Sequence, residues 1–235
     1  MPATTIDRMP ENRLMAEFSM WSADLLRLGD ELDRIARVAD LLHIDVADGH
    51  FAPSMLFFPD LVAAIKKRTK VPIHVHLMVD DAILVSQASE FAAAGADLVS
   101  IHVENVGAAA AALDRLAEIG VAAGMVLQVS TPVATVAQFL PRLRFLTLLG
   151  TAIGVKGQSL DPRATGRLRE ARTLIAASGA RHRIVVAADG GIREQTVPLL
   201  RAAGAETVVL GSLAFGAPDL AARIGWLHAL PAPAA

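Results

Sequence analysis

The chain contains no cysteine among its 235 residues. Disulfide bonds, thiolate metal ligands and a thiol nucleophile are therefore excluded, and any bound metal must rely on histidine and carboxylate ligands. A chain without cysteine also suits a reducing compartment, and we expect a cytoplasmic protein.

Long apolar runs and an excess of basic charge are also missing. No apolar run reaches the roughly 18 residues of a membrane span, and the first residues carry charges and prolines where a signal peptide needs an apolar core. The 22 lysine and arginine residues nearly balance the 24 aspartate and glutamate residues and are scattered along the chain. This distribution predicts no binding of nucleic acid or membranes, and a small polar substrate is the expected partner.

Hydrophobic residues make up 53% of the chain, which is enough to build a sizeable core. Short β-prone apolar runs recur roughly every 25 to 30 residues, and each is followed by a turn and a helical stretch. We expect strands near residues 14–18, 41–45, 73–78, 98–102, 122–127, 145–149, 184–188 and 207–210. We expect helices near residues 24–39, 59–66, 81–94, 107–119, 133–140, 163–178, 194–203 and 219–228.

Alternating strands and helices predict an α/β fold with a parallel sheet, and eight units favour a closed (β/α)₈ TIM barrel. An open Rossmann-type sheet would need Gly-x-Gly-x-x-Gly after the first strand. Instead, the first strand runs into Ser19-Met20-Trp21-Ser22-Ala23-Asp24. No linker divides the chain, so we expect a single TIM-barrel domain over residues 1–235, with loose ends near 1–12 and 231–235.

Chemistry in such barrels lies where strands end. The polar residues at the predicted strand ends are Ser19, His43, Asp45, His76, His102 and Asp189. His43 and Asp45 are two residues apart, so in a strand their side chains share a face. An imidazole beside a carboxylate forms either half of a metal site or a hydrogen-bonded strand end.

Three neighbouring loops are rich in glycine. Asp189-Gly190-Gly191 follows the seventh strand, Gly211-Ser212 follows the eighth, and Gly154-Val155-Lys156-Gly157 follows the sixth. Glycine lets backbone N–H groups approach an anion closely, and barrels commonly bind phosphate at this position. Lys156 either contacts that phosphate or is a solvated loop lysine.

Several of these motifs, in one order along almost the whole chain, resemble the ribulose-phosphate 3-epimerases. These enzymes are metal-dependent (β/α)₈ barrels that invert carbon 3 of a ketose phosphate. The matching motifs are Ser19-Met20-Trp21-Ser22-Ala23-Asp24, His43-Ile44-Asp45-Val46-Ala47-Asp48-Gly49-His50-Phe51, His76-Leu77-Met78-Val79, His102-Val103-Glu104, Asp189-Gly190-Gly191 and Gly211-Ser212.

The resemblance implies one divalent metal ion, such as zinc, iron, manganese or cobalt, held by His43, Asp45, His76 and Asp189. It assigns the two acid/base groups to Asp45 and Asp189. It implies that the substrate is bound by Ser19, His76, Met78, Gly154, Lys156, Gly157, Gly190, Gly191, Gly211 and Ser212. It also implies a homo-oligomer, a dimer or a hexamer, with a role in carbohydrate metabolism and the pentose phosphates.

The reaction that the resemblance implies is D-ribulose 5-phosphate to D-xylulose 5-phosphate, by proton transfer at carbon 3 through an ene-diolate. The chain departs from the family at Ala47 and Leu149, where a pocket methionine is customary, and at His74, where aspartate is common. The family's Pro-Gly-Phe-Gly-Gly-Gln loop is here Ile153-Gly154-Val155-Lys156-Gly157-Gln158. Another ketose phosphate, such as allulose 6-phosphate or a tetrulose phosphate, is therefore an alternative substrate.

Two other kinds of function remain as alternatives. A lyase or decarboxylase could use the same barrel, but no lysine lies on a predicted strand and the decarboxylase pattern Asp-x-Lys-x-x-Asp is absent. A binding protein without turnover would be expected to have lost at least one of the four ligand positions. We further expect His74 to be a packed, hydrogen-bonded core residue, and His102 and Glu104 to be supporting polar groups.

Overall fold

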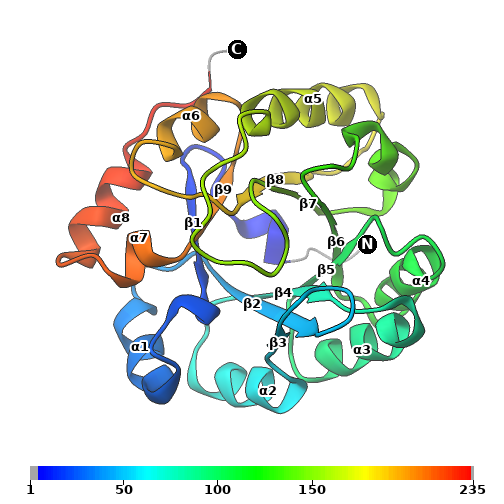
Figure 1. Ribbon diagram of the computed structural model, residues 1–235, viewed down its shortest axis with the longest axis horizontal. Coiled ribbons are helices and arrows are strands. Elements are labelled where there is room, and N and C mark those ends of the chain that lie inside the picture. The colour runs from blue at the N-terminus through cyan, green and yellow to red at the C-terminus, as the bar shows by residue number, and fades with distance from the viewer. Residues whose placement is uncertain (1–4, 234–235) are drawn as a thin grey trace.

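The computed structural model describes residues 5–233 and consists of a closed barrel of parallel strands surrounded by helices (Figure 1). The predicted TIM barrel is therefore confirmed. Its strands are β1 (Met15–Ser19), β2 (Leu41–Asp48), β4 (Ile73–Met78), β5 (Leu98–His102), β6 (Ala122–Leu127), β7 (Phe145–Leu149), β8 (Val185–Asp189) and β9 (Thr207–Leu210). The pairing of β1 with both β9 and β2 closes the barrel.

The helices that cover the barrel are α1 (Leu28–Ile35), α2 (Pro59–Arg68), α3 (Asp81–Ala93), α4 (Ala109–Ile119), α5 (Ala164–Ala177), α6 (Val197–Ala202), α7 (Ser212–Phe215) and α8 (Leu220–His228). Short 3₁₀ helices are η1 (Thr5–Arg8), η2 (Met20–Ser22), η3 (Leu25–Arg27) and η4 (Val133–Arg142). Among the described residues, no helix is long and apolar enough to cross a membrane.

Several predicted elements differ in detail from the structure. The helix expected over 24–39 is divided into η3 and α1, and the one expected over 133–140 is the 3₁₀ helix η4, which contains Pro141. Proline lacks the N–H that a continuing α-helix needs. The sequence analysis also missed α7 and the short strand β3 (Met55–Leu56), which pairs antiparallel with the end of β2.

The expected loose terminus over residues 1–12 is wrong for residues 5–9. Residues 5–8 form η1, the side chain of Ile6 is fully buried, and Met9 is nearly so. Both pack with Leu98 and Phe145 at the amino ends of the strands, where they cover apolar side chains that water would otherwise reach. Figure 1 shows this first helical turn behind the barrel. Residues 1–4 and 234–235 lie outside the described residues, and 231–233 form no regular element.

The barrel interior changes from apolar to polar along its axis. Met15, Leu41 and Phe145 form part of an apolar cluster at the amino ends of the strands. Two residues further along these three strands the side chains point the same way, and these positions hold the polar residues Glu17, His43 and Thr147. The buried polar residues at this level and on neighbouring strands are Glu17, His43, His74, Ser100, Thr147 and Thr207. The interior is thus built as an apolar base beneath a polar middle.

Gly124 on β6 provides a test of how tightly this middle is packed. A Cβ atom at Gly124 would overlap Ser100 Oγ and lie 3.1 Å from Phe145 Cβ. We expect Gly124→Ala to lower the free energy of unfolding by about 1–3 kcal/mol, as overpacking of a barrel core does. Denaturant unfolding followed by circular dichroism measures this change.

The matched control is Gly166→Ala on α5, where an added Cβ would have no atom within 4 Å. Because alanine favours a helix over glycine, this control is expected to raise the free energy of unfolding, by up to about 1 kcal/mol. Equal stability of Gly124→Ala and the wild type would contradict the close approach.

Candidate active site

A cavity of about 320 Å³ opens at the carboxyl ends of the strands, which is a size suited to a small ligand. Asp45 and Asp189 lie in its wall. It is also lined by all the residues that the sequence analysis expected to bind substrate, namely Ser19, His76, Met78, Gly154, Lys156, Gly157, Gly190, Gly191, Gly211 and Ser212. The structure thus brings together loops that are up to about 190 residues apart in sequence.

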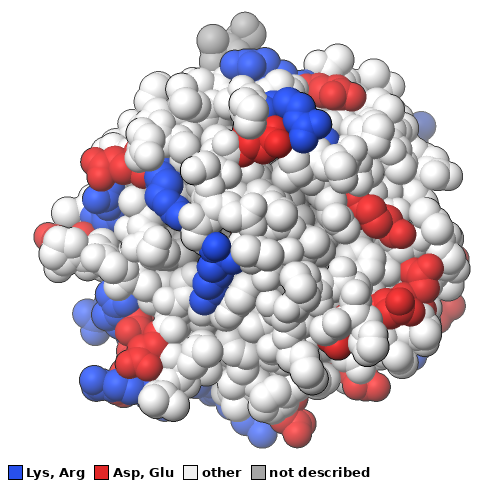
Figure 2. Space-filling model, viewed as in Figure 1, with Lys and Arg blue, Asp and Glu red and all other residues white. Residues whose placement is uncertain are grey.

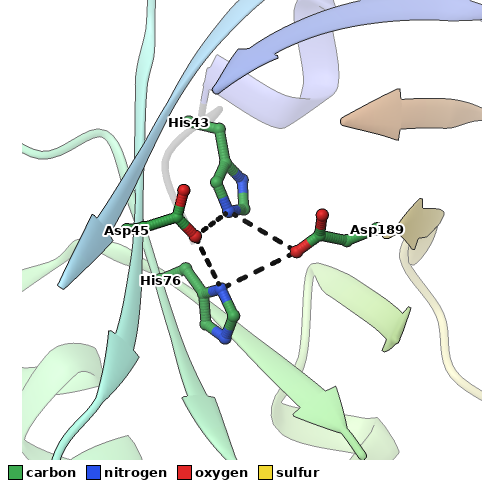
Figure 3. A group of neighbouring side chains, drawn as sticks. All are labelled: His43, Asp45, His76 and Asp189. Carbon is green, nitrogen blue, oxygen red and sulfur yellow. Dashed lines mark hydrogen bonds and ion pairs between the residues drawn. The ribbon is translucent and has the colours of Figure 1, made fainter. Parts of the chain in front are cut away.

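At the base of the cavity, four side chains point toward a common centre: His43, Asp45, His76 and Asp189 (Figure 3). His43 Nε2 lies 3.1 Å from Asp45 Oδ1 and 3.8 Å from Asp189 Oδ2. His76 Nδ1 lies 3.4 Å and 3.9 Å from the same two oxygen atoms. The four potential ligand atoms all lie within 4.8 Å of one another.

These residues fit a divalent metal ion. Ligand atoms about 2.1 Å from a tetrahedral ion are separated by roughly 3.4 Å, which is close to the spacing seen here. His76 Nδ1 is buried and makes no hydrogen bond in the described protein. A buried nitrogen without a partner costs about 1–3 kcal/mol, and a metal ligand bond would satisfy it. Two imidazoles and two carboxylates suit several divalent metals, so these four residues do not select one metal.

The second ring nitrogen of each imidazole is bound to a buried polar group. His43 Nδ1 lies 2.8 Å from Glu17 Oε1, and His76 Nε2 lies 2.8 Å from His102 Nε2. His102 in turn contacts Glu104 through its Nδ1 at 2.9 Å. Such outer contacts hold a metal-binding imidazole in one orientation and one tautomer. These contacts agree with the prediction that His102 and Glu104 are supporting polar groups, which stays a prediction.

The two carboxylates of the cluster have opposite electrostatic environments. Burial raises the pKa of Asp189 to about 6, an effect that His43 opposes and Asp45 reinforces. Burial also acts on Asp45, but His43 and His76 outweigh it and hold the pKa of that carboxyl well below its usual range. Ser19 Oγ donates a hydrogen bond of 3.0 Å to Asp45 Oδ2. Similar side chains with separated pKa values are typical of acid/base sites.

The glycine loops need glycine for steric reasons. Gly190 and Gly191 have φ values of +87° and +71°, which side chains rarely adopt, and a Cβ on Gly191 would lie 2.7 Å from Leu160 Cα. Lys156 is held in place, because its Nζ donates a 2.6 Å hydrogen bond to the Trp21 carbonyl and lies 4.3 Å from the centre of the Trp21 ring. The loop lysine therefore packs over the cavity wall.

The sequence analysis missed Glu17, the buried carboxylate beneath the cluster. Burial opposes its ionisation, but His74 and His43 together lower the pKa of Glu17 to about 2. The available signal was a glutamate two residues before Ser19 in an apolar strand, on the same face as Ser19. His74 contacts it through Nδ1 at 2.5 Å, so the prediction of a packed, hydrogen-bonded His74 is confirmed. Trp21, Ser22, Thr151 and Arg193 also line the cavity.

The raised pKa of Asp189 predicts a pH-dependent stability for the metal-free protein. Its pKa rises from about 3.9 in the unfolded chain to about 6 in the folded one, so the folded state binds this proton more tightly. Stability is therefore lost as the pH rises through this window. We expect Asp189→Asn to be more stable than the wild type above pH 7, by on the order of 2 kcal/mol, and equal below pH 4. Denaturant unfolding in the presence of a chelator, above pH 7 and below pH 4, tests this expectation. The same difference in unfolding free energy between the two proteins at both pH values would contradict it.

Comparisons with solved structures agree with this fold. Orotidine 5′-phosphate decarboxylase from Pyrococcus horikoshii is 16% identical, with a TM-score of 0.63, over 91% of this chain and 97% of that one. A 3-hexulose-6-phosphate synthase from Salmonella typhimurium is 17% identical, with a TM-score of 0.61, over 92% and 98%. At this level of identity the likeness concerns the barrel alone.

Comparisons of sequence are more specific. The chain is 34% identical to a ribulose-phosphate 3-epimerase of Bacillus subtilis over 86% of this chain and 92% of the relative. It is 35% identical to one of Synechocystis over 92% and 93%, and 34% identical to one of Escherichia coli over 86% and 88%. The sequence model described as the ribulose-phosphate 3 epimerase family matches residues 15–215. These matches span the barrel and its cavity, and the chain belongs to the ribulose-phosphate 3-epimerase family.

Proposed function

We propose that the protein is a metal-dependent ketose-phosphate 3-epimerase that interconverts D-ribulose 5-phosphate and D-xylulose 5-phosphate. Its family makes it an isomerase of sugar phosphates. The observation that carries the proposal is the pair of carboxylates, Asp45 on β2 and Asp189 on β8, that lie on opposite sides of two imidazoles at the base of one cavity (Figure 3). Inversion of a carbon next to a ketone needs two such groups.

The metal would be held by His43, Asp45, His76 and Asp189. When bound, a divalent ion polarises the ketone and the neighbouring hydroxyl of the sugar and so favours loss of the proton on carbon 3. Asp45 and Asp189 then divide the proton transfer: one carboxylate removes the proton, and the other returns a proton to the opposite face. Each acid/base group contributes about 10² to 10⁴-fold, or about 3–5 kcal/mol of barrier.

The remaining cavity residues support binding of the sugar phosphate. Ser19 orients Asp45 through its hydrogen bond and lies in the cavity wall. The phosphate is assigned to the loops that contain Gly154, Gly157, Gly190, Gly191, Gly211 and Ser212. Backbone N–H groups and a nearby cation are the usual partners of phosphate in this part of a barrel. Figure 2 shows the basic side chains on this face as separate groups with acidic ones on the same face, without the continuous basic surface that a polyanion would need.

The wall around carbon 3 bears on the choice of sugar. Ala47 packs with Ala52 and Met78 in a small cluster, and Leu149 lines the cavity nearby. Met78 is the one methionine among the described residues that line this wall, so another ketose phosphate, such as allulose 6-phosphate or a tetrulose phosphate, is the second candidate substrate. A Schiff-base lyase is disfavoured, because no strand among the described residues contains a lysine. The homo-oligomer and the cytoplasmic location stay predictions.

Deuterium exchange at carbon 3 tests the chemistry. Metal-loaded protein in D₂O is incubated with ribulose 5-phosphate, allulose 6-phosphate or a tetrulose phosphate, and incorporation is followed by NMR. We expect exchange with ribulose 5-phosphate and a loss of at least about 10²-fold in rate for Asp45→Asn and for Asp189→Asn, because each removes one acid/base group.

Asp60→Asn is the matched control, since Asp60 is an exposed aspartate on α2, away from the cavity. It should exchange at the wild-type rate. Faster exchange with one of the other sugars would change the substrate assignment, and exchange with none of them would overturn the epimerase proposal.

Lys156 provides a separate test of phosphate binding. If its ammonium group contacts the phosphate, Lys156→Glu should raise the Michaelis constant about 10 to 100-fold, because a charged hydrogen bond worth about 1.5–3 kcal/mol becomes repulsion. Lys156→Met keeps the length of the side chain and its packing on Trp21, and should show a smaller increase. An unchanged Michaelis constant for Lys156→Glu would rule out the contact.

A further inference from the structure

The middle of this barrel is polar where barrels of this kind are usually filled by bulky branched apolar residues. Glu17, His43, His74 and Ser100 lie directly beneath the proposed metal site, and each is fully buried. Only His43 belongs to the proposed ligand set. Buried polar groups are costly unless they are hydrogen-bonded, so the other three need a reason to be there.

Glu17 lies at the centre of this group. Its Oε1 atom lies 2.8 Å from His43 Nδ1 and 2.5 Å from His74 Nδ1, and its second oxygen lies 3.5 Å from Thr207 Oγ1. On the far side, His74 Nε2 lies 2.7 Å from Ser100 Oγ. The glutamate comes from β1, and the imidazoles come from β2 and β4, which pair with each other along their length.

This arrangement fixes where the protons are. An ionised carboxylate can only accept hydrogen bonds, so both Nδ1 atoms donate to Glu17. His74 Nε2 then carries no proton and accepts from the Ser100 hydroxyl. His43 therefore donates from Nδ1 to Glu17, and Nε2 is the nitrogen that faces Asp45 and Asp189. Without a metal, Nε2 donates to Asp45 Oδ1 at 3.1 Å, and a bound metal would take the place of that proton.

We propose that Glu17 is the positioning residue of the metal centre, and that it holds the His43 ring in the orientation and tautomer that present Nε2 to the metal. The inference rests on the proposed metal site. His74 and Ser100 complete the arrangement by holding Glu17 from the other side. The carboxylate comes from β1, which pairs with the strand of His43, and His74 comes from β4 on the other side of that strand.

A second metal ion among Glu17, His43 and His74 is the competing interpretation, since these residues also form a cluster of potential ligands. The distances favour hydrogen bonds. Both nitrogen atoms approach the same oxygen at 2.5–2.8 Å, whereas tetrahedral ligand atoms lie roughly 3.4 Å apart. The upper cluster, at 3.1–3.9 Å, has the wider spacing that ligands need.

The test is the zinc affinity of the metal-stripped full chain, measured by competition with a chromophoric chelator. We expect Glu17→Ala to weaken zinc binding 10 to 100-fold, as loss of an outer partner of a ligating histidine does. Glu17→Gln keeps an oxygen acceptor for His43 and should lose less. Thr147→Val is the control: Thr147 is equally buried in the barrel and its hydroxyl has no partner, so its affinity should stay within about twofold.

Affinities of both Glu17 variants within twofold of the wild type would overturn the proposal, and so would two tightly bound zinc ions per chain. If either variant fails to fold, ¹⁵N NMR of the zinc-loaded wild type decides: we expect His43 to be protonated at Nδ1 and metal-bound at Nε2, and the reverse overturns the proposal. A wild type that binds no divalent ion would defeat the proposed metal site itself, an outcome distinct from unaffected Glu17 variants.

Discussion

The rest of the site depends on one interaction, the pairing of the His43 imidazole with a carboxylate at each of its ring nitrogens. The imidazole is buried completely inside the barrel and has a polar partner at each ring nitrogen, Glu17 below and Asp45 above. An imidazole and carboxylates taken out of water are stable only when each is paired. The chain meets this requirement by placing an acidic residue on the strand next to β2. The paired groups lie between the apolar cluster at the amino ends of the strands and the cavity at their carboxyl ends.

Two regularities of the barrel place this pairing directly below the cavity. Side chains two residues apart along a strand point the same way, so the sequence Leu41, His43, Asp45 rises from base to cavity on one face. Parallel strands all end at the same rim, so β8 delivers Asp189 opposite Asp45. Glycines at positive φ then let the loops after β7 and β8 close in beside these carboxylates.

The proposed function assigns reactivity and selectivity to different parts of the molecule. The buried cluster would hold the metal and transfer the proton through two carboxylates. The cavity wall, with Leu149 and the Lys156 side chain packed on Trp21, would then decide which sugar fits above the cluster. Ala47 packs with Met78, which lines that wall. Substitutions in that wall change shape and charge without disturbing the buried pairs.

The sequence by itself determined the order of the eight barrel strands, because periodicity and turn residues are local signals. The family resemblance of its motifs, rather than periodicity, indicated ten of the residues that line the cavity. It did not determine the role of Glu17, whose partners His43 and His74 lie 26 and 57 residues away. It also missed the burial of Ile6 beneath the barrel and the short pairing of β3 with β2. Only the tertiary structure decided these three features. They depend on which residues come into contact across strands and between distant segments, and local sequence patterns do not specify those contacts.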